Sequence, residues 1–276
     1  MSRWTIDEPT TLGFDGVVAL RATLIAGSVS VLASGDRPGI QVEALDGPPL
    51  VIGHEAGMLT ITHERLWEGV LSWLRTQKCH ATITVTVPHD CPVSLNLVSA
   101  DAVVSGTTAR TSVKSASGNV VLDGVHGDID ANTVSGDVEV QGPARRITFT
   151  SVSGDLTLAG GTVDRLAARS ARGRIAADVG LAREGRIEVN TVAGEVALRI
   201  PDPADAEVAL NSAAGGRLET SFPGLDRRDR SVSRAVTGRL GAGTGRVSVN
   251  TVSGAVALLG RPRDDSPEIT TPGMEK

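Results

Sequence analysis

Aromatic side chains are scarce in this sequence. Only 2% of its 276 residues are Phe, Trp or Tyr, and tyrosine is absent. Large aromatic side chains often fill the centre of a thick globular core, so their scarcity argues against such a core. Hydrophobic residues nevertheless reach 40%, carried mainly by Val, Ala, Leu and Ile, and there are 32 glycines. This composition favours a thin core made of many similar layers.

The chain also lacks an excess of positive charge and a long apolar run. Its net charge is -5 and its pI is about 5.6, so nucleic acid is a disfavoured partner. The opening MSRWTIDEPTTLGFDG is polar and acidic where a signal peptide would be apolar. No later window approaches the ~20 apolar residues of a membrane span. We therefore expect no transmembrane segment and a cytoplasmic location.

Cysteine is rare as well. Cys79 and Cys91 are the two present, and neither belongs to a C-x-x-C pattern. Their spacing does not show whether they form a disulfide, so their pairing stays open. The G-G-x-G-x-D word of calcium-binding β-helices is absent. No motif predicts a cofactor or a metal ion.

One phrase, in contrast, is written repeatedly. NTVSGDVEV at residues 132–140 returns as TSVSGDLTL, NTVAGEVAL and NTVSGAVAL. The central glycines are separated by 18, 18, 19, 21, 21 and 39 residues, at Gly118, Gly136, Gly154, Gly173, Gly194, Gly215 and Gly254, and Ala100 takes the preceding position. Such a fixed period is typical of a repeat protein in which each repeat is one structural layer.

Each repeat alternates apolar and polar residues, as a half-buried strand does. Val120, Val138 and Leu156 share the position two residues after the glycine and are expected to face inward in one stack. Further glycines six residues after this repeat position mark a second turn, at Gly106, Gly124, Gly142 and Gly160. The pattern predicts an all-β fold, a right-handed parallel β-helix (β-solenoid) with rungs of about 18–21 residues.

The flanking segments predict the domain organisation. Residues 1–95 contain extended stretches and are expected to form an N-terminal β region that covers one end of the 96–260 solenoid. Within that region, the apolar spacing in ERLWEGVLSWLRTQK predicts a short amphipathic capping helix near 64–77. Residues 261–276 are polar and proline-bearing, which is typical of a flexible tail. Residues 216–249 fit either an extra rung or an inserted loop.

Several of these motifs together point to a family. The SGDVEV-type repeats, the N-terminal FDGVVALRATLIAGSVSV, the tryptophan helix before ATITVTVP and the closing GRVSVNTVSGAVAL resemble the bacterial putative-adhesin family of β-strand-repeat proteins, a domain of unknown function. The resemblance covers roughly residues 12–260. It implies a β-helical fold, and it supplies no catalytic residue.

Three polar columns recur with the repeat. Acidic residues follow the repeat position at Asp101, Asp137, Asp155 and Glu195; asparagines precede it by four residues at Asn96, Asn132, Asn190, Asn211 and Asn250; and serines precede it directly at Ser117, Ser135, Ser153 and Ser253. Paired carboxylates could bind a cation or act as acid and base, but Asn119 and Arg174 interrupt the acidic column. Asp, Asn and Ser are also ordinary turn residues, so we expect structural roles and neither a metal site nor a catalytic serine.

The sequence thus favours a non-enzymatic scaffold or protein-interaction protein, adhesin-like, with an unknown protein partner. The segments that interrupt the repeat are the expected contact regions, with Trp67 and Trp73 in the helix and Arg227, Arg228 and Arg230 in the FPGLDRRDRSVSR segment. Two alternatives stay open. One is a carbohydrate-active β-helix enzyme resembling polysaccharide lyases, and the other is a filament-forming solenoid resembling bactofilins.

Overall fold

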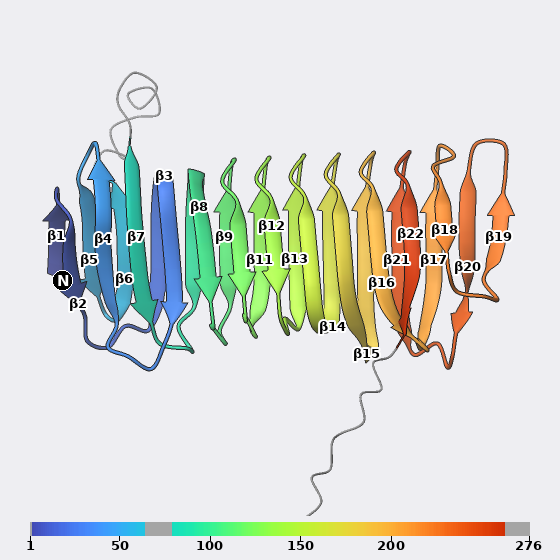
Figure 1. The fold of residues 1–276 in the computed structure, drawn as a ribbon, viewed down its shortest axis with the longest axis horizontal. Coiled ribbons are helices and arrows are strands. Elements are labelled where there is room, and N and C mark those ends of the chain that lie inside the picture. The colour runs from blue at the N-terminus through green and yellow to red at the C-terminus, as the bar shows by residue number, and fades with distance from the viewer. Residues whose placement is uncertain (1, 64–78, 263–276) are drawn as a thin grey trace, which may run out of the picture.

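The computed structural model describes residues 2–63 and 79–262. Within these ranges the regular elements are all strands, and no helix that could span a membrane occurs. The all-β prediction is confirmed. The predicted helix near 64–77, with Trp67 and Trp73, lies outside the described residues, as do residues 263–276 of the predicted tail. Figure 1 shows the strands side by side along one long axis.

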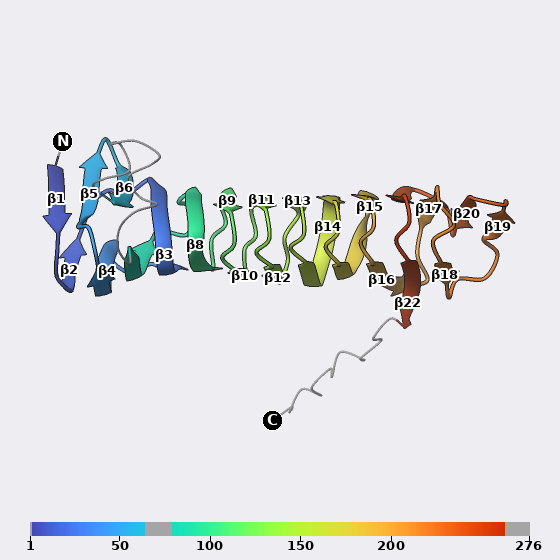
Figure 2. The same ribbon diagram turned by 90° about the horizontal axis from the view of Figure 1, so that it is seen from above.

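The strands are arranged in two layers, which Figure 2 shows from above. We call them face 1 and face 2. In spatial order, face 1 contains β1 (Ser2–Ile6), β5 (Leu50–Glu55), β6 (Met58–His63), the start of β3 (Ala19–Ala33), the start of β8 (Val93–Ser105), β9 (Thr111–Ser115), β11 (Asp128–Thr133), β13 (Arg146–Ser151), the ends of β14 (Leu156–Ser170) and β15 (Ile175–Thr191), β21 (Gly245–Thr251), β17 (Ala206–Ser212), β20 (Arg234–Leu240) and β19 (Asp226–Asp229).

Face 2 contains β2 (Thr10–Gly13), β4 (Gly39–Asp46), β7 (His80–Val87), the ends of β3 and β8, β10 (Val120–Asp123), β12 (Val138–Gln141), the starts of β14 and β15, β16 (Val196–Asp202), β22 (Val256–Pro262) and β18 (Leu218–Thr220). The long strands β3, β8, β14 and β15 each contribute to both faces. Pairing is parallel through the central rungs and antiparallel at the two ends.

The core lies between the two faces. Val120 pairs with Val138 and Val138 with Leu156, and each of the three side chains is at most 2% exposed. Ile129 and Ile147 form the equivalent stack on face 1. The predicted register of inward residues is confirmed. Each rung therefore buries its aliphatic pair against identical pairs above and below it.

The two glycine columns have different causes. At the repeat position a Cβ would overlap the backbone of the preceding rung, as at Gly136, where it would meet the carbonyl oxygen of Gly118. These glycines allow close approach and have no positive φ. The second column instead has positive φ, for example 60° at Gly124 and 97° at Gly142. There the chain adopts the left-handed region that side chains rarely occupy.

The last rung does not stack last. β21 pairs with β15 on one side and β17 on the other, while β22 pairs with β16 and β18. The rung at residues 245–262 therefore lies between two rungs that precede it in sequence, as Figure 1 shows by the red strands among orange ones. The segment 216–249 contains elements of both predicted alternatives. β18 stacks on β22 as part of a rung, the antiparallel pair β19 and β20 is inserted after it, and β21 begins at Gly245.

This arrangement corrects one predicted repeat position. The stack on Gly254 is continued by Gly216, whose Cβ would meet the Gly254 carbonyl oxygen, and the predicted Gly215 instead has a φ of 74°. The boundaries also differ in detail from the prediction. β8 crosses the expected division at residue 95, and β22 includes Arg261 and Pro262 from the start of the predicted tail.

Antiparallel strands close both faces at the N-terminal end and face 1 at the other end, where face 2 ends in the parallel strand β18. At the N-terminal end β1 and β2 form the outermost strands of faces 1 and 2. At the other end of face 1, β19 has the sequence DRRD and all four side chains are exposed. Charged edge strands oppose pairing with another chain, so this edge is protected against end-to-end addition.

The position of the last rung can be tested with engineered cysteines in a Cys79→Ser background. We expect Asn190→Cys/Asn250→Cys and Asn250→Cys/Asn211→Cys to form disulfides, because each pair is one rung apart, about 4.8 Å. Asn190→Cys/Asn211→Cys should not, because two rungs separate the residues by about 10 Å and a disulfide needs Cα atoms within ~7 Å. Non-reducing electrophoresis after mild oxidation distinguishes the three. Efficient cross-linking of the 190/211 pair alone would show rungs stacked in sequence order.

Candidate functional site

The predicted acidic column is a ladder between rungs. The side-chain oxygen of Asp101 accepts a hydrogen bond from the backbone N–H of Asn119, at 2.8 Å. The pattern continues from Asn119 to the N–H of Asp137, from Asp137 to that of Asp155 and from Asp155 to that of Arg174, at 2.7 to 3.1 Å. Asn119, which interrupts the acidic column in the sequence, therefore accepts the same rung-to-rung hydrogen bond as the aspartates. These side chains satisfy backbone donors at the turn, as predicted for turn residues.

The fourth acid of the column is engaged differently. Glu195 forms an ion pair with the Arg174 guanidinium at 3.3 Å. Across residues 2–63 and 79–262, no group of three or more His, Cys, Asp or Glu side chains is arranged to hold a metal ion.

The asparagine column forms an amide ladder at the C-terminal end. Asn211 Nδ2 donates to Asn250 Oδ1 at 3.0 Å, and Asn250 Nδ2 donates to Asn190 Oδ1 at 3.1 Å. These three amides have a structural role, as predicted for the column, whereas Asn132 Nδ2 donates to Asp130 at 2.8 Å. The order of the ladder, 190–250–211, follows the spatial order of the rungs.

An additional column of hydroxyl groups, not identified from the sequence, lies inside the turn. In most rungs a Ser or Thr hydroxyl three residues before the glycine accepts a hydrogen bond from its N–H, for example Thr133 for Gly136 at 2.9 Å and Thr191 for Gly194 at 3.0 Å. For Gly216 the acceptor is Ser212, four residues before it, at 2.7 Å. These hydroxyl-bearing residues are buried. The sequence signal is S/T-x-x-G, present in the repeated phrase. The role of this pattern becomes clear only once the turn is known to be buried, because a buried glycine N–H needs a hydrogen-bond acceptor.

The predicted serine column is also structural. Ser117 Oγ and Ser135 Oγ donate to the Val98 and Ala116 carbonyl oxygens of the preceding rung, both at 3.1 Å. In the part of the chain that the structure describes, no hydrogen bond joins the serine column to a histidine. The arrangement lacks the nucleophile–base contact of a serine hydrolase.

Both cysteines are free, which settles their pairing. Cys91 is buried, and desolvation, with a smaller contribution from nearby Asp90, raises the pKa of its thiol to about 11. Burial also raises the pKa of Cys79. A reactive cysteine needs a lowered pKa, so neither thiol has the character of a nucleophile.

Two histidine nitrogens near the N-terminal end are buried without a hydrogen-bond partner among the described residues, His54 Nε2 and His63 Nε2. The His54 ring packs against Phe14, with centroids 5.7 Å apart. His63 is 1% exposed, and its Nδ1 lies 3.4 Å from the Pro48 carbonyl oxygen. Burial lowers the pKa of His63, which the Pro48 contact only partly offsets.

The predicted contact arginines lie at the exposed end of face 1. Arg227 and Arg228 belong to β19, and Arg230 follows it. The Arg227 guanidinium pairs with Asp229 at 3.1 Å. These residues are brought together by one short edge strand, and the three grooves lined by residues within 108–164, 207–248 and 184–246 do not include them.

An exposed aliphatic column runs along one narrow edge of the solenoid. We call it the valine ridge, and it consists of Val98, Ala116, Val134, Val152, Ala171, Val192, Val252 and Ala213. Rung-to-rung hydrogen bonds hold it in register, such as those from Ser153 N–H to the Val134 carbonyl and from Ser253 N–H to the Val192 carbonyl, both at 2.9 Å. The ridge valines are 37% to 54% exposed. Eight rungs span about 34 Å.

A basic column lies on the outer surface of face 1. Arg146, Arg165, Arg186 and Arg246 are partners in successive rungs, and we call them the arginine row. All four are exposed, because each precedes a buried residue at the start of its strand segment. Their spacing in sequence is 19, 21 and 60 residues, so the row becomes visible only once the pairing is known.

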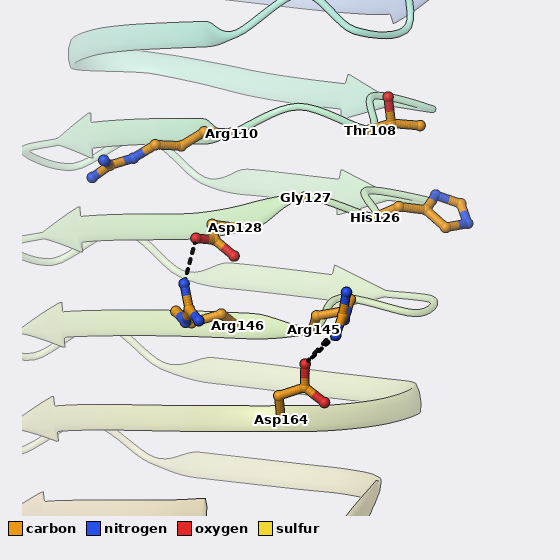
Figure 3. A pocket seen from close by; sticks show the side chains of 8 residues that line it. All are labelled: Thr108, Arg110, His126, Gly127, Asp128, Arg145, Arg146 and Asp164. Carbon is orange, nitrogen blue, oxygen red and sulfur yellow. Dashed lines mark hydrogen bonds and ion pairs between the residues drawn. The ribbon is translucent and has the colours of Figure 1, made fainter. Parts of the chain in front are cut away.

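The arginine row begins at a polar groove of about 450 Å³, drawn in Figure 3. There Arg146 pairs with Asp128 at 2.9 Å and Arg145 with Asp164 at 2.8 Å. Arg110 also lines the groove and pairs with Asp130 at 3.2 Å. A second groove, of about 400 Å³, lies at the other end of the row and includes Arg186 and Arg246.

The repeated rungs agree with a known sequence family. The family model described as Toastrack DUF4097 matches residues 46–259, more than half of the chain. The chain belongs to the Toastrack DUF4097 family. This confirms the resemblance to the putative-adhesin proteins, a domain of unknown function.

One solved structure shares the fold of this Toastrack protein, and a second aligns with most of the chain at a lower score. A putative adhesin from Bacteroides fragilis NCTC 9343 is 15% identical, with a TM-score of 0.53 and coverage of 92% of this chain and 97% of that one. A putative lipid binding protein from Parabacteroides distasonis ATCC 8503 is 14% identical, with a TM-score of 0.39 and coverage of 92% and 96%. No curated protein matches the chain.

We expect the buried His63 to make the stability of this Toastrack protein depend on pH. Its folded-state pKa is lowered, while an unfolded histidine titrates near ~6.5. Above that pH both states are neutral at this residue. As the pH falls below ~6.5 the unfolded chain takes up a proton that the folded protein does not, so stability decreases, by at most about 1.4 kcal/mol per pH unit.

We expect urea unfolding at pH 7.5 and pH 5.5 to show this loss, and His63→Leu to reduce the difference between the two pH values. The control is His126→Gln, because His126 is exposed and should leave the difference unchanged. An equal pH difference in the intact protein and His63→Leu would contradict the assignment.

Proposed function

We propose that this Toastrack protein is a non-enzymatic binding scaffold that presents its regular outer surfaces to a partner protein. The valine ridge is the observation that carries the proposal. Five of its eight rungs carry an exposed valine and the other three an alanine, along about 34 Å of one edge. Single exposed aliphatic residues are common, but a continuous apolar strip on a rigid support is typical of an interaction surface.

The polar columns support the same proposal. The carboxyl, amide and hydroxyl groups that repeat with the rungs bind backbone or side-chain groups of the same or the neighbouring rung. They stabilise a rigid surface, since each group already has a partner in its own or the neighbouring rung. A solenoid of this kind presents an extended contact area that does not change shape on binding.

The filament alternative is less well supported. End-to-end addition of chains needs strand edges that can pair, and β19 instead presents four exposed residues, two acidic and two basic. The alternative of a carbohydrate-active enzyme is also less well supported, because the repeated carboxylates accept hydrogen bonds from backbone N–H groups. We also propose a cytoplasmic location, on the sequence argument above.

The test is affinity capture of partner proteins from native cell extract with intact protein and a ridge variant, Val134→Ser/Val152→Ser/Val192→Ser. The matched control, Val18→Ser/Leu32→Ser/Val103→Ser, removes exposed aliphatic side chains elsewhere, 38% to 62% exposed. We expect the ridge variant to lose the partner and the control to keep it. Calorimetry with the purified partner then measures the loss directly.

Circular dichroism and thermal melting must first show that all variants fold. The proposal fails if the ridge variant and the control recover the same partners as the intact protein. It also fails if the intact protein turns over a polysaccharide in a substrate screen.

A further inference from the structure

The arginine row on face 1 is independent of the valine ridge. It places four arginines in four successive rungs, with Cα atoms about 4.8 Å apart and about 14 Å from first to last. The strands hold the Cα positions rigidly, so the charges form a line parallel to the long axis of the solenoid. The spacing of this line is set by strand pairing.

The charges at the two ends of the row are partly neutralised. Asp128 pairs with Arg146 at 2.9 Å, and Glu207 pairs with Arg246 at 3.0 Å. The two central members, Arg165 and Arg186, form no ion pair and no side-chain hydrogen bond within residues 2–63 and 79–262. Four arginines and two acids leave a charge of +2 along this line, on a protein whose net charge is -5.

The surface beside the row carries hydroxyl or methyl groups at three of its four positions and a carboxylate at the other. The next outward positions on three of the four strands are Thr148, Ala167 and Ser248. On the fourth strand the position is held by Glu188, whose carboxylate accepts a hydrogen bond from Asn190 Nδ2 at 3.0 Å. The aromatic residues among those described are Trp4, Phe14, Phe149 and Phe222, and none occupies an outward position beside the row.

We propose that the arginine row binds a linear acidic polysaccharide, with the sugar chain lying along the solenoid axis. A guanidinium can donate two parallel hydrogen bonds to one carboxylate, so the pair has a defined geometry and is stronger than a single hydrogen bond. A polymer with one carboxylate per sugar repeats its charge at a length comparable to the rung spacing. The two grooves at the ends of the row extend the path, and Thr148 and Ser248 can exchange hydrogen bonds with sugar hydroxyls.

Single-stranded nucleic acid fits the same surface less well. Proteins that bind it combine a basic path with aromatic side chains on which bases stack, and the row has no such platform. The proposal concerns binding alone and includes no catalytic step.

The test measures binding of polygalacturonate to the intact protein by calorimetry at low and high salt. Methyl-esterified polygalacturonate is the matched ligand, because it keeps the sugar chain and loses the charge. Arg165→Gln/Arg186→Gln should weaken binding about tenfold or more. Arg227→Gln/Arg228→Gln removes the same charge from β19 and should bind as the intact protein does.

We expect binding that weakens with salt, that needs the free carboxylates and that depends on Arg165 and Arg186. The proposal is overturned if the intact protein does not bind polygalacturonate, or if the central variant binds it as well as the intact protein. Equal loss in the β19 control would show a general charge effect and overturn the site. So would tighter binding of single-stranded DNA or of anionic phosphatidylglycerol vesicles. None of these results depends on the valine ridge, so the two proposals fail separately.

Discussion

The close approach of successive rungs at the glycine column is the constraint on which the structure depends. At this position the carbonyl oxygen of one rung occupies the space that a Cβ of the next would need. The glycine N–H is then buried, and the Ser or Thr hydroxyl three residues earlier accepts it. Because the turn is this tight, the aliphatic pairs on both sides of it fall into register.

The same constraint explains why polar residues repeat without forming a catalytic site. A stack of identical turns places identical side chains above one another, and each can then bind the backbone or side chain of its neighbour. Asp101 and Asn119 do this with N–H groups of the next rung, although one is an acid and the other an amide. The column therefore needs an acceptor oxygen, and charge is secondary. Rows of functional groups are a consequence of stacking, and the surface rows that remain exposed are where binding can vary.

Much of the fold could be predicted from the sequence, because the repeat period and the alternation of apolar residues are local signals. They predicted the stack of Val120, Val138 and Leu156 and the structural roles of the repeated polar residues. The intercalated rung could not be predicted, since residues 245–262 carry the same phrase as any other rung and nothing local states which neighbour they pair with. The regular spacing also predicted Gly215 as the repeat glycine, whereas the next residue, Gly216, occupies that position in the structure.

The candidate surfaces were harder to predict than the fold. The valine ridge is part of the repeated phrase, but its exposure depends on the turn geometry. The arginine row needs the pairing of four strands separated by 19, 21 and 60 residues. Arg227 and Arg228 were identified because their charges are adjacent in sequence, and the structure places them on an edge strand.

The central claim is that backbone contact at the glycine column holds the rungs together, and Gly136→Ala tests it most directly. Its methyl group would overlap the Gly118 carbonyl oxygen, whereas the control Gly35→Ala would meet no atom within 4 Å. Chemical denaturation should show Gly136→Ala destabilised by about 1–3 kcal/mol or more. Gly35→Ala should change stability by no more than about 1 kcal/mol. Equal stability of the two variants would contradict the account.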